Sequence, residues 1–372
     1  MIKGKKGKLL VNLLVLLVTI VFFLIVFEIF LRVVIKVPVP PARFIPDRYT
    51  EYRLQPDSTF VMRSPDFSTP TTINSLGIRD NELRDLEKKE YRILMLGDSL
   101  TFGNGVLLND TFSQLIEKRL QKKTGKDIEV INAGTGGYGT VNEMKYLRHY
   151  GFELFNPDMV IVNYFVGNDL SDNLRKAENF TVMSGYLVSI KSLTLMNRIK
   201  FFLFAHSRTA VFLGRIINDK LAYDKKGDEL PLDFKQFIKD QEDAEIEEGW
   251  NLTFAALEEI KKMTDEKEIP FILVIIPMKE QVYNHFFENA KENFNLKQEQ
   301  LDMTLVNTKL VKFAQEQNIT ILDLHEPFKE AKEQGLYFEI DSHMSQEGHS
   351  ITAEKTYPLI IKEIKEKVSV EQ

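Results

Sequence analysis

The chain has 372 residues, 44% of them apolar, and its 48 basic and 54 acidic residues give a formal net charge of −6. This composition supports one large domain or two ordinary ones and excludes an intrinsically disordered chain. Without a basic excess we expect no nucleic acid among its partners. The absence of cysteine excludes a thiolate nucleophile, a disulfide framework and a cysteine-ligated metal.

An apolar run from Leu9 to Phe27 follows four lysines at the N-terminus. Its 19 residues would form a helix of roughly 28 Å, close to the thickness of a bilayer. A cleaved signal peptide, the alternative, has a shorter apolar region that ends in a small-x-small site, whereas this run continues through EIFLRVVIKV. Glu28 and Arg32 follow at i, i+4 spacing and can pair.

The sequence therefore predicts a retained transmembrane anchor within residues 1–36, with membrane contact through residues 9–35. The lysines before the run place the N-terminus in the cytoplasm. The remainder is then expected outside the cytoplasm, in the periplasm or at the cell surface. Residues 37–90 read as a proline-rich, extended stalk followed by a polar, turn-rich approach segment.

From Tyr91 onward, short apolar strands alternate with amphipathic helices, which predicts an α/β domain over 91–372. Strands that are apolar throughout indicate a parallel sheet covered on both faces. The expected strands are Arg92–Leu96, Ile128–Asn132, Asp158–Phe165, Phe271–Ile276 and Ile319–Leu322. An insertion at about 170–239 interrupts this rhythm. Its apolar stretch carries several charges, which favours a helical cap beside the active site over a second transmembrane helix.

Two glycine-containing turns follow the first two strands. Ser99, in RILMLGDSLTFGNGV, stands where a serine hydroxyl can be exposed at the carboxyl end of a sheet, although Asp and Ser are also common helix caps. The second turn, INAGTGGYGT, contains Gly134-x-Gly136-x-x-Gly139, a formal match to the dinucleotide-binding pattern. A lone match is weak, so a dinucleotide-dependent enzyme stays as an alternative, and we expect no cofactor.

Two polar turns come later in the chain. Asn168 ends the third strand in VNYFVGNDL, where its side-chain amide can donate to an oxyanion or simply form a turn. His343, in EIDSHMSQEGH, can accept a serine proton, and Asp341 is the nearest carboxylate to orient it. His349 is the substitute base. The histidines show no metal-ligand spacing, so we expect no metal.

These four elements together resemble the SGNH/GDSL hydrolase family, in the family's order and roughly its spacing. The resemblance implies a flavodoxin-like three-layer α/β/α sandwich with Ser99 as nucleophile, His343 as base and Asp341 as its acid. It further implies an oxyanion hole of the Ser99 N–H, the Gly137 N–H and the Asn168 side chain, with Gly134 as the less fitting glycine.

The chain departs from the family pattern in two places. Val166 stands where a glycine usually precedes the third-block asparagine, and Asp341 lies two residues before His343 instead of three. The shorter spacing occurs in relatives that O-acetylate exported polysaccharides. GDSLTFGNGV and the preceding NSLGIRD are also similar to membrane-anchored bacterial members of the family.

The sequence thus predicts an extracytoplasmic serine esterase that acts on O-acyl esters, above all O-acetyl esters, of an envelope polysaccharide or lipid. The alternatives are an O-acyltransferase with the same acyl-serine intermediate and a non-catalytic binding module on the same fold.

Overall fold

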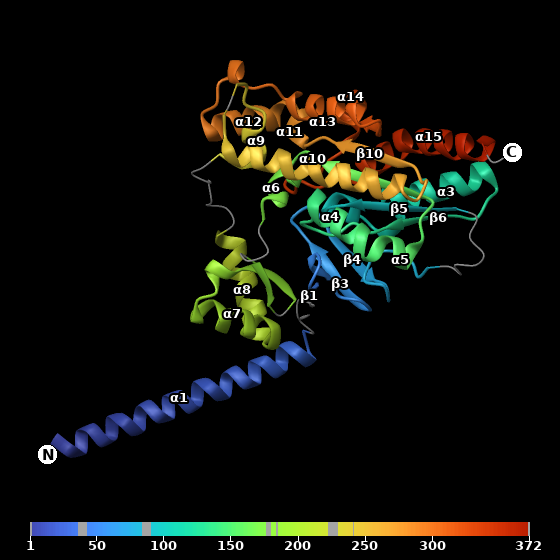
Figure 1. Ribbon diagram of the computed structural model, residues 1–372. Coiled ribbons are helices and arrows are strands. Elements are labelled where there is room, and N and C mark those ends of the chain that lie inside the picture. The colour runs from blue at the N-terminus through green and yellow to red at the C-terminus, as the bar shows by residue number, and fades with distance from the viewer. Residues whose placement is uncertain are drawn as a thin grey trace. The chain divides into compact units, whose positions relative to one another are not determined.

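The computed structural model describes residues 2–35, 43–83, 91–175, 180–183, 185–221, 230–240 and 242–370 (Figure 1). The chain divides into two compact units. One consists of Met1–Ala42 and Val182–Lys226, and the other of Arg43–Thr181 and Gly227–Gln372.

A five-stranded parallel sheet forms the centre of the larger unit. Its strand order is β11-β10-β7-β5-β6, and every strand is paired in parallel with its neighbours. The strands are β5 (Tyr91–Gly97), β6 (Ile128–Asn132), β7 (Met159–Phe165), β10 (Phe271–Ile276) and β11 (Thr320–Asp323). All residues of β6, β7 and β10 are buried, as expected for strands covered on both faces. The predicted α/β fold with a parallel sheet is confirmed.

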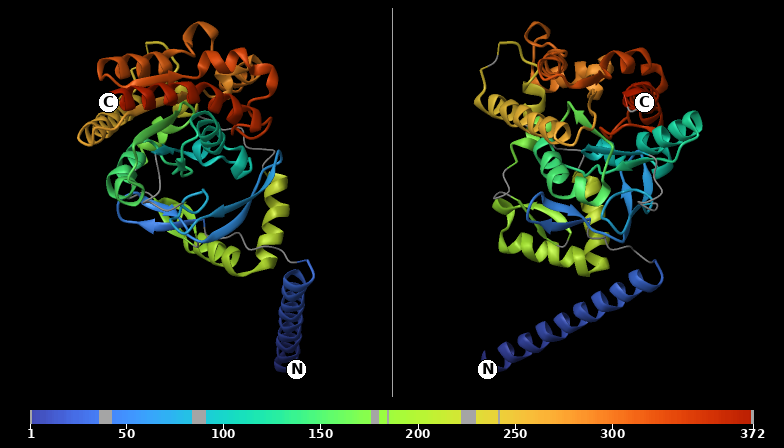
Figure 2. Two further views of the ribbon diagram at one scale, coloured as in Figure 1. Left: turned by 90° about the vertical axis from the view of Figure 1, so that its right-hand side faces the viewer. Right: turned by 45° about the vertical axis from the view of Figure 1, so that its right-hand side comes forward.

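Helices cover both faces of this sheet (Figure 2). Helix α3 packs against α15, while α4 packs against α10. The connections from β5 to β6 and from β6 to β7 run in opposite directions across the sheet, so right-handed crossovers put α3 and α4 on opposite faces. The main helices are α3 (Phe112–Thr124), α4 (Thr140–Tyr146), α10 (Ala244–Asp265), α12 (Asn284–Phe294), α13 (Leu305–Glu316) and α15 (Gln346–Val370). Shorter ones are α2 (Ser99–Phe102), α5 (Phe152–Phe155), α6 (Asp169–Asn173), α9 (Leu232–Lys235), α11 (Lys279–Val282) and α14 (His325–Glu330).

The strand order reverses between β5 and β7. The chain moves from β5 to the edge strand β6 and then returns to β7 on the other side of β5. In open α/β sheets, the carboxyl ends of strands at such a reversal leave a crevice where ligands bind. The turns after β5 and β7 therefore border this crevice.

Two hairpins precede the sheet in the chain and belong to the same unit. They are β1 (Phe44–Asp47) with β2 (Glu51–Leu54), and β3 (Ser58–Arg63) with β4 (Ser68–Ile73). Buried and exposed residues alternate along β3 and β4, and the buried apolar side chains Phe60, Met62 and Ile73 join a core cluster with Phe102 of α2. Of the predicted stalk, residues 37–42 lie outside the described residues, and Phe44–Asp47 is paired as a strand.

The smaller unit is helical, apart from β9 (Tyr186–Ser189), which pairs with β8 (Phe180–Met183). Its helices are α1 (Ile2–Val33), α7 (Leu195–His206) and α8 (Arg208–Leu221). Within α1, Val11–Val33 is long and apolar enough to cross a membrane, judged by length and composition. The carboxyl-terminal part of α1 packs against α8, where Leu31 and Val211 form a small core.

Candidate active site

The turn after β5 presents Ser99 at the carboxyl end of the sheet. A side chain at Gly97 would place its Cβ 2.0 Å from Thr101 Oγ1, so this turn needs glycine. Asp98 then caps α2, with its Oδ1 accepting the Leu100 N–H at 2.8 Å. Ser99 is consequently the first residue of α2, and its hydroxyl lies 3.2 Å from Asp98 Oδ2.

The loop before α15 brings an imidazole and a carboxylate to this serine. His343 Nε2 lies 2.8 Å from Ser99 Oγ. On the other side of the ring, Nδ1 is hydrogen-bonded to Asp341 Oδ1, which also accepts the His343 N–H at 3.0 Å. A carboxylate at Nδ1 favours the tautomer with its proton there, which leaves Nε2 free to accept the serine proton. This arrangement can activate a hydroxyl for attack on a carbonyl carbon.

Asp341 remains ionised in this setting. Partial burial acts to raise its pKa, but the hydrogen bonds and the charge of His343 outweigh burial, and the pKa of the carboxyl lies below its usual value. Asp66, in the turn between β3 and β4, holds the same loop: its Oδ2 accepts the N–H groups of Ile340 at 3.0 Å and of Asp341 at 2.7 Å. The hairpin thus helps to position the carboxylate.

Asn104 is a second contact of the imidazole that sequence reasoning missed. Its Nδ2 lies 3.0 Å from His343 Nε2, the same nitrogen that faces Ser99. Its backbone N–H donates to the Ser99 carbonyl at 3.1 Å, just past the end of α2. The motif GDSLTFGNGV contains this asparagine, but nothing in the spacing shows that the turn brings it back to the histidine.

Arg79 fastens the loop that carries Asn104. Its guanidinium is buried and donates to the carbonyls of Phe102 at 2.8 Å, Gly103 at 2.5 Å and Val106 at 2.6 Å. Backbone carbonyls that accept from a buried cation are strongly held in place. This contact gives a structural role to the arginine of NSLGIRD, which the sequence analysis left without one.

Asn168 and Gly137, the other expected site residues, come from the neighbouring turns. Asn168 follows β7 and directly precedes α6, and its side chain acts to lower the pKa of Asp98, the neighbour of Ser99, against the effect of burial. Gly137 has a φ of +78°, and its carbonyl accepts from Arg175 at 2.9 Å. The glycine directly beside the serine is Gly136, where an added Cβ would lie 3.8 Å from Ser99 Cβ.

The remaining glycines of this loop allow close packing within the chain. A Cβ at Gly134 would lie 2.3 Å from the backbone nitrogen of Phe102 in α2, and one at Gly139 would lie 2.6 Å from Asn173 Oδ1 in α6. The space beside these two glycines is filled by protein. The formal dinucleotide pattern therefore reflects the packing of α2 and α6 against the loop.

Buried acids lie on the inner side of the site. Burial raises the pKa of Asp98, and it raises the pKa values of Glu143 and Asp169 well above their usual range, to which the neighbouring carboxyl groups add. The shifts arise because burial and mutual repulsion both disfavour the charged forms of these neighbouring carboxyl groups.

His349 is placed away from Ser99. It is buried in α15, where its Nδ1 accepts the Phe112 N–H at 3.2 Å and its ring stacks on Phe112. Among the described residues, no group of three or more His, Cys, Asp or Glu side chains is arranged to hold a metal ion.

The sequence is similar to one known protein family. The sequence model of this family, described as GDSL-like Lipase/Acylhydrolase, matches residues 93–356. No curated protein matches the chain. Similar solved structures include a lipolytic G-D-S-L family member from Veillonella parvula (12% identity, TM-score 0.38, covering 71% of this chain and 94% of that one). A second is a lipase/acylhydrolase from Enterococcus faecalis (15% identity, TM-score 0.37, covering 73% of this chain and 95% of that one). A third is an acetyl xylan esterase from Geobacillus stearothermophilus (14% identity, TM-score 0.38, covering 72% of this chain and 93% of that one).

Proposed function

The chain belongs to the GDSL-like lipase/acylhydrolase family and is a carboxylic ester hydrolase, and from this we propose that it works through an acyl-serine intermediate on Ser99. The contact of 2.8 Å between Ser99 Oγ and His343 Nε2 carries the proposal. It joins a hydroxyl to an imidazole whose other nitrogen is held by a carboxylate.

In the proposed first step, His343 takes the Ser99 proton while Oγ attacks the ester carbonyl carbon. The tetrahedral intermediate then collapses, and the alcohol leaves with the proton from His343. In the second step, water loses a proton to His343 and attacks the acyl-serine. The bond from the acyl carbon to Oγ then breaks, His343 returns the proton to Ser99 Oγ, and the carboxylic acid is released. Asp341 stabilises the imidazolium that forms in each step.

The proposed oxyanion hole uses the N–H of Ser99, the N–H of Gly137 and the side-chain amide of Asn168. Within the described residues, the N–H groups of Ser99 and Gly137 donate to no backbone carbonyl in the turns and loops. Asn168 supports this role by its position at the carboxyl end of β7, the strand next to β5, and by its side chain's effect on the pKa of Asp98 beside the nucleophile. Gly136 leaves open space next to the serine, where a substrate carbonyl can approach.

The proposed location is the outer side of a membrane, with α1 as a retained anchor and the hydrolase unit extracytoplasmic. The lysines that precede the apolar run support this orientation. The proposed substrate is accordingly an O-acyl ester, foremost an O-acetyl ester, of an envelope polysaccharide or lipid. If a sugar hydroxyl reaches the acyl-serine before water, the same site acts as an O-acyltransferase.

The test uses the full-length protein in detergent with p-nitrophenyl acetate, butyrate and octanoate. We expect Ser99→Ala and His343→Ala each to lower kcat by about 10³-fold or more. The matched control is His285→Ala, which removes an exposed histidine of α12. The preferred chain length separates acetyl esters from lipid esters, and added oligosaccharide separates transfer from hydrolysis. Turnover that survives Ser99→Ala would refute the serine mechanism.

A further inference from the structure

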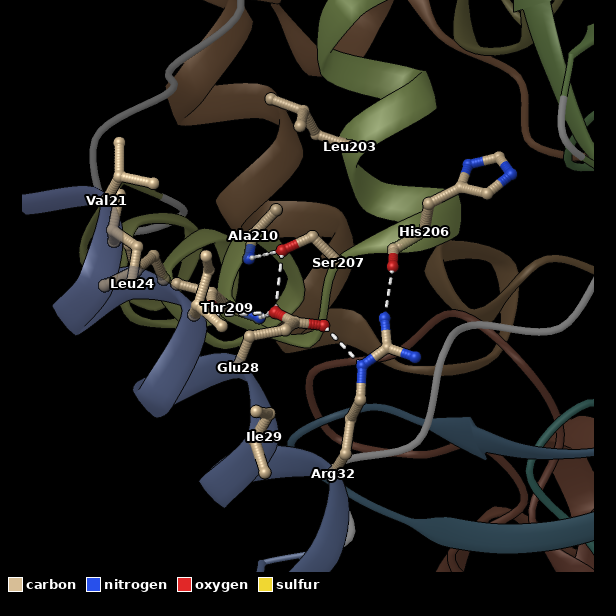
Figure 3. Close-up of a pocket in the computed structure, with 12 residues that line it drawn as sticks. Val21, Leu24, Glu28, Ile29, Arg32, Leu203, His206, Ser207, Thr209 and Ala210 are labelled. Carbon is tan, nitrogen blue, oxygen red and sulfur yellow. Dashed lines mark hydrogen bonds and ion pairs between the residues drawn. The ribbon is translucent and has the colours of Figure 1, made fainter. Parts of the chain in front are cut away.

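The carboxyl-terminal end of α1 is built into the fold of the smaller unit. Glu28 accepts hydrogen bonds from the backbone N–H groups of Arg208 and Thr209, each at 2.8 Å. It also accepts from the hydroxyls of Ser207 at 2.9 Å and Thr209 at 2.8 Å, and Figure 3 shows Glu28 beside these two residues. These N–H groups belong to the first turn of α8, which has no helical acceptors for them. A carboxylate at this position also interacts favourably with the helix dipole.

Apolar and cationic contacts reinforce this junction. Phe27 packs edge-to-face on Phe212 with ring centroids 6.0 Å apart, next to the core of Leu31 and Val211. Arg32 donates to Glu28 at 2.8 Å, as its spacing predicted, and to the His206 carbonyl at 2.7 Å. Cleavage after α1 would remove the partner of α8, so the contacts favour a retained anchor over a signal peptide.

A groove of about 610 Å³ runs between α1 and the pair α7 and α8. Val21, Leu24, Ile25 and Ile29 line it from α1, within the stretch that can span a membrane. Leu203 and Leu213 contribute from the other side. Glu28, Arg32 and His206 also line the groove, so it would lie where the headgroup region meets the hydrocarbon layer and take the upper part of acyl chains.

Helix α7 carries an apolar face that the described residues leave uncovered. Leu195, Met196, Ile199, Phe202 and Leu203 are all exposed, Leu195 by 75% of its surface. At 100° per residue these positions occupy a sector of about 120°. Of the ten large apolar side chains exposed beyond residue 35 in the described chain, seven lie between Ile190 and Leu213.

Basic side chains border this face. Arg198 and Lys200 lie on either side of the apolar sector and are exposed. Residues 185–218 contain five Lys or Arg residues and no Asp or Glu. An apolar helix face flanked by cations matches a helix that lies in the plane of a bilayer surface, where the cations reach anionic headgroups.

We propose that α7 and the adjoining part of α8 lie in the headgroup region of the membrane that α1 spans, with the apolar face of α7 inserted among lipids. The partner is a lipid bilayer that contains anionic lipid. This inference rests on the proposed anchoring role of α1, but it is independent of the serine chemistry.

The absence of cysteine makes a direct test possible, because every introduced thiol is unique. The full-length chain carries Phe202→Cys in α7, Leu16→Cys in α1, or Lys312→Cys on the exposed surface of α13 as the water-facing control. Each thiol takes an environment-sensitive fluorophore, and the protein is placed in phosphatidylcholine vesicles with or without phosphatidylglycerol. Quenching by lipid-borne nitroxides is measured, and unchanged thermal unfolding midpoints verify folding.

We expect position 202 to be quenched at least threefold more than position 312, and more strongly with phosphatidylglycerol than without it. Arg198→Glu with Lys200→Glu should remove the dependence on anionic lipid. If position 16 is quenched while position 202 behaves like position 312, α7 does not enter the membrane and the proposal fails. If position 16 is also unquenched, the proposed anchoring by α1 fails.

The same labels in native membranes test for a protein partner. Quenching at position 202 in native membranes but not in the lipid vesicles would indicate a protein partner and overturn the lipid assignment. Ser99→Ala should leave all these results unchanged.

Discussion

At the scale of single residues, the candidate site is a chain of three side chains with supports on both sides. Asp341 holds His343 by two hydrogen bonds, while Asp66 holds the backbone of Asp341. Asn104 approaches the imidazole nitrogen that also faces Ser99. Asp66 precedes α2 in the sequence and Asn104 follows it, so the position of the imidazole depends on two separate loops.

Asp341→Asn tests the contribution of the carboxylate. The amide cannot stabilise the imidazolium, and its N–H₂ can donate to Nδ1 and favour the wrong tautomer. We expect kcat for p-nitrophenyl acetate to fall by about 10²- to 10⁴-fold with little change in KM. Glu339→Gln removes an exposed carboxylate of the same loop and should leave kcat unchanged. Equal effects of the two variants would contradict the role of Asp341.

Asn104 is expected to act as a positioning residue. Asn104→Ala should lower kcat by about tenfold, because the imidazole loses one of its fixed contacts. Asn104→Asp places a carboxylate beside the ring, which favours the imidazolium. The acid limb of the pH–rate profile should therefore move to higher pH. Asn109→Ala, in the exposed part of the same loop, serves as the control. A profile that does not move in Asn104→Asp would count against the contact.

The residues predicted from sequence differ from those that were missed in one respect. Ser99, Asn168 and His343 each occupy a turn that follows a strand or precedes a helix, and each stands within a motif. Asn104 and Asp66 reach the site only because their loops fold back onto His343 and Asp341. The path of a loop cannot be read from a sequence motif. The role of Gly137 stays a prediction from spacing, and the Cβ position nearest to Ser99 in this loop is that of Gly136.

At the scale of elements, the loop after β6 and the helix α2 have to approach each other closely. Gly134→Ala would put a methyl group 2.3 Å from the Phe102 nitrogen, which is backbone and cannot rotate away. We expect a loss of about 3 kcal/mol in the free energy of unfolding, together with loss of turnover as α2 shifts.

Gly136→Ala is the matched control for this clash. Its methyl group would lie 3.8 Å from Ser99 Cβ, an ordinary contact distance. Stability should stay within about 1 kcal/mol of the wild type, and the thermal midpoints of the two variants provide the comparison. Equal midpoints would show that the loop relaxes without cost.

The elements of the sheet were predictable because its strands are buried on both faces and therefore apolar throughout. All five predicted strands occur, each within two residues of its expected ends. The two hairpins over residues 44–73 were harder to predict from sequence, since their strands are short and only alternately apolar. The pairing of α1 with α8 had no local signal, because the Glu28 contacts join residues about 180 positions apart.

At the scale of the whole molecule, stability should depend on pH through His349. Burial lowers the pKa of His349 to about 3, while in the unfolded chain its value is 6.5. Between these values the unfolded state binds more protons, so stability is lost as pH falls below about 6.5. From pH 7 to pH 4 the loss amounts to about 3 kcal/mol.

The measurement compares thermal unfolding of the wild type and His349→Gln across this pH range. Glutamine does not titrate, and its carbonyl can still accept the Phe112 N–H. We expect the wild type to lose its advantage over the variant as the pH falls. His285→Gln changes an exposed histidine and should track the wild type. A constant difference at every pH would contradict a neutral, buried His349.

The hydrogen bonds between Glu28 and the start of α8 also constrain the order in which the chain can fold during synthesis. They join residues up to 181 positions apart, so at typical elongation rates of 5–20 residues per second the ribosome needs roughly 10 to 40 s to supply the second partner. During that interval β5, β6 and β7 are made, while β10 and β11 are still unsynthesised. If α1 is the proposed anchor, it enters the bilayer before α8 exists, when Glu28 has Arg32 but none of its α8 partners. Assembly of the smaller unit can then finish only after β7 has been made. A nascent chain arrested before Ser207 would expose Glu28, which offers a marker for the order of assembly.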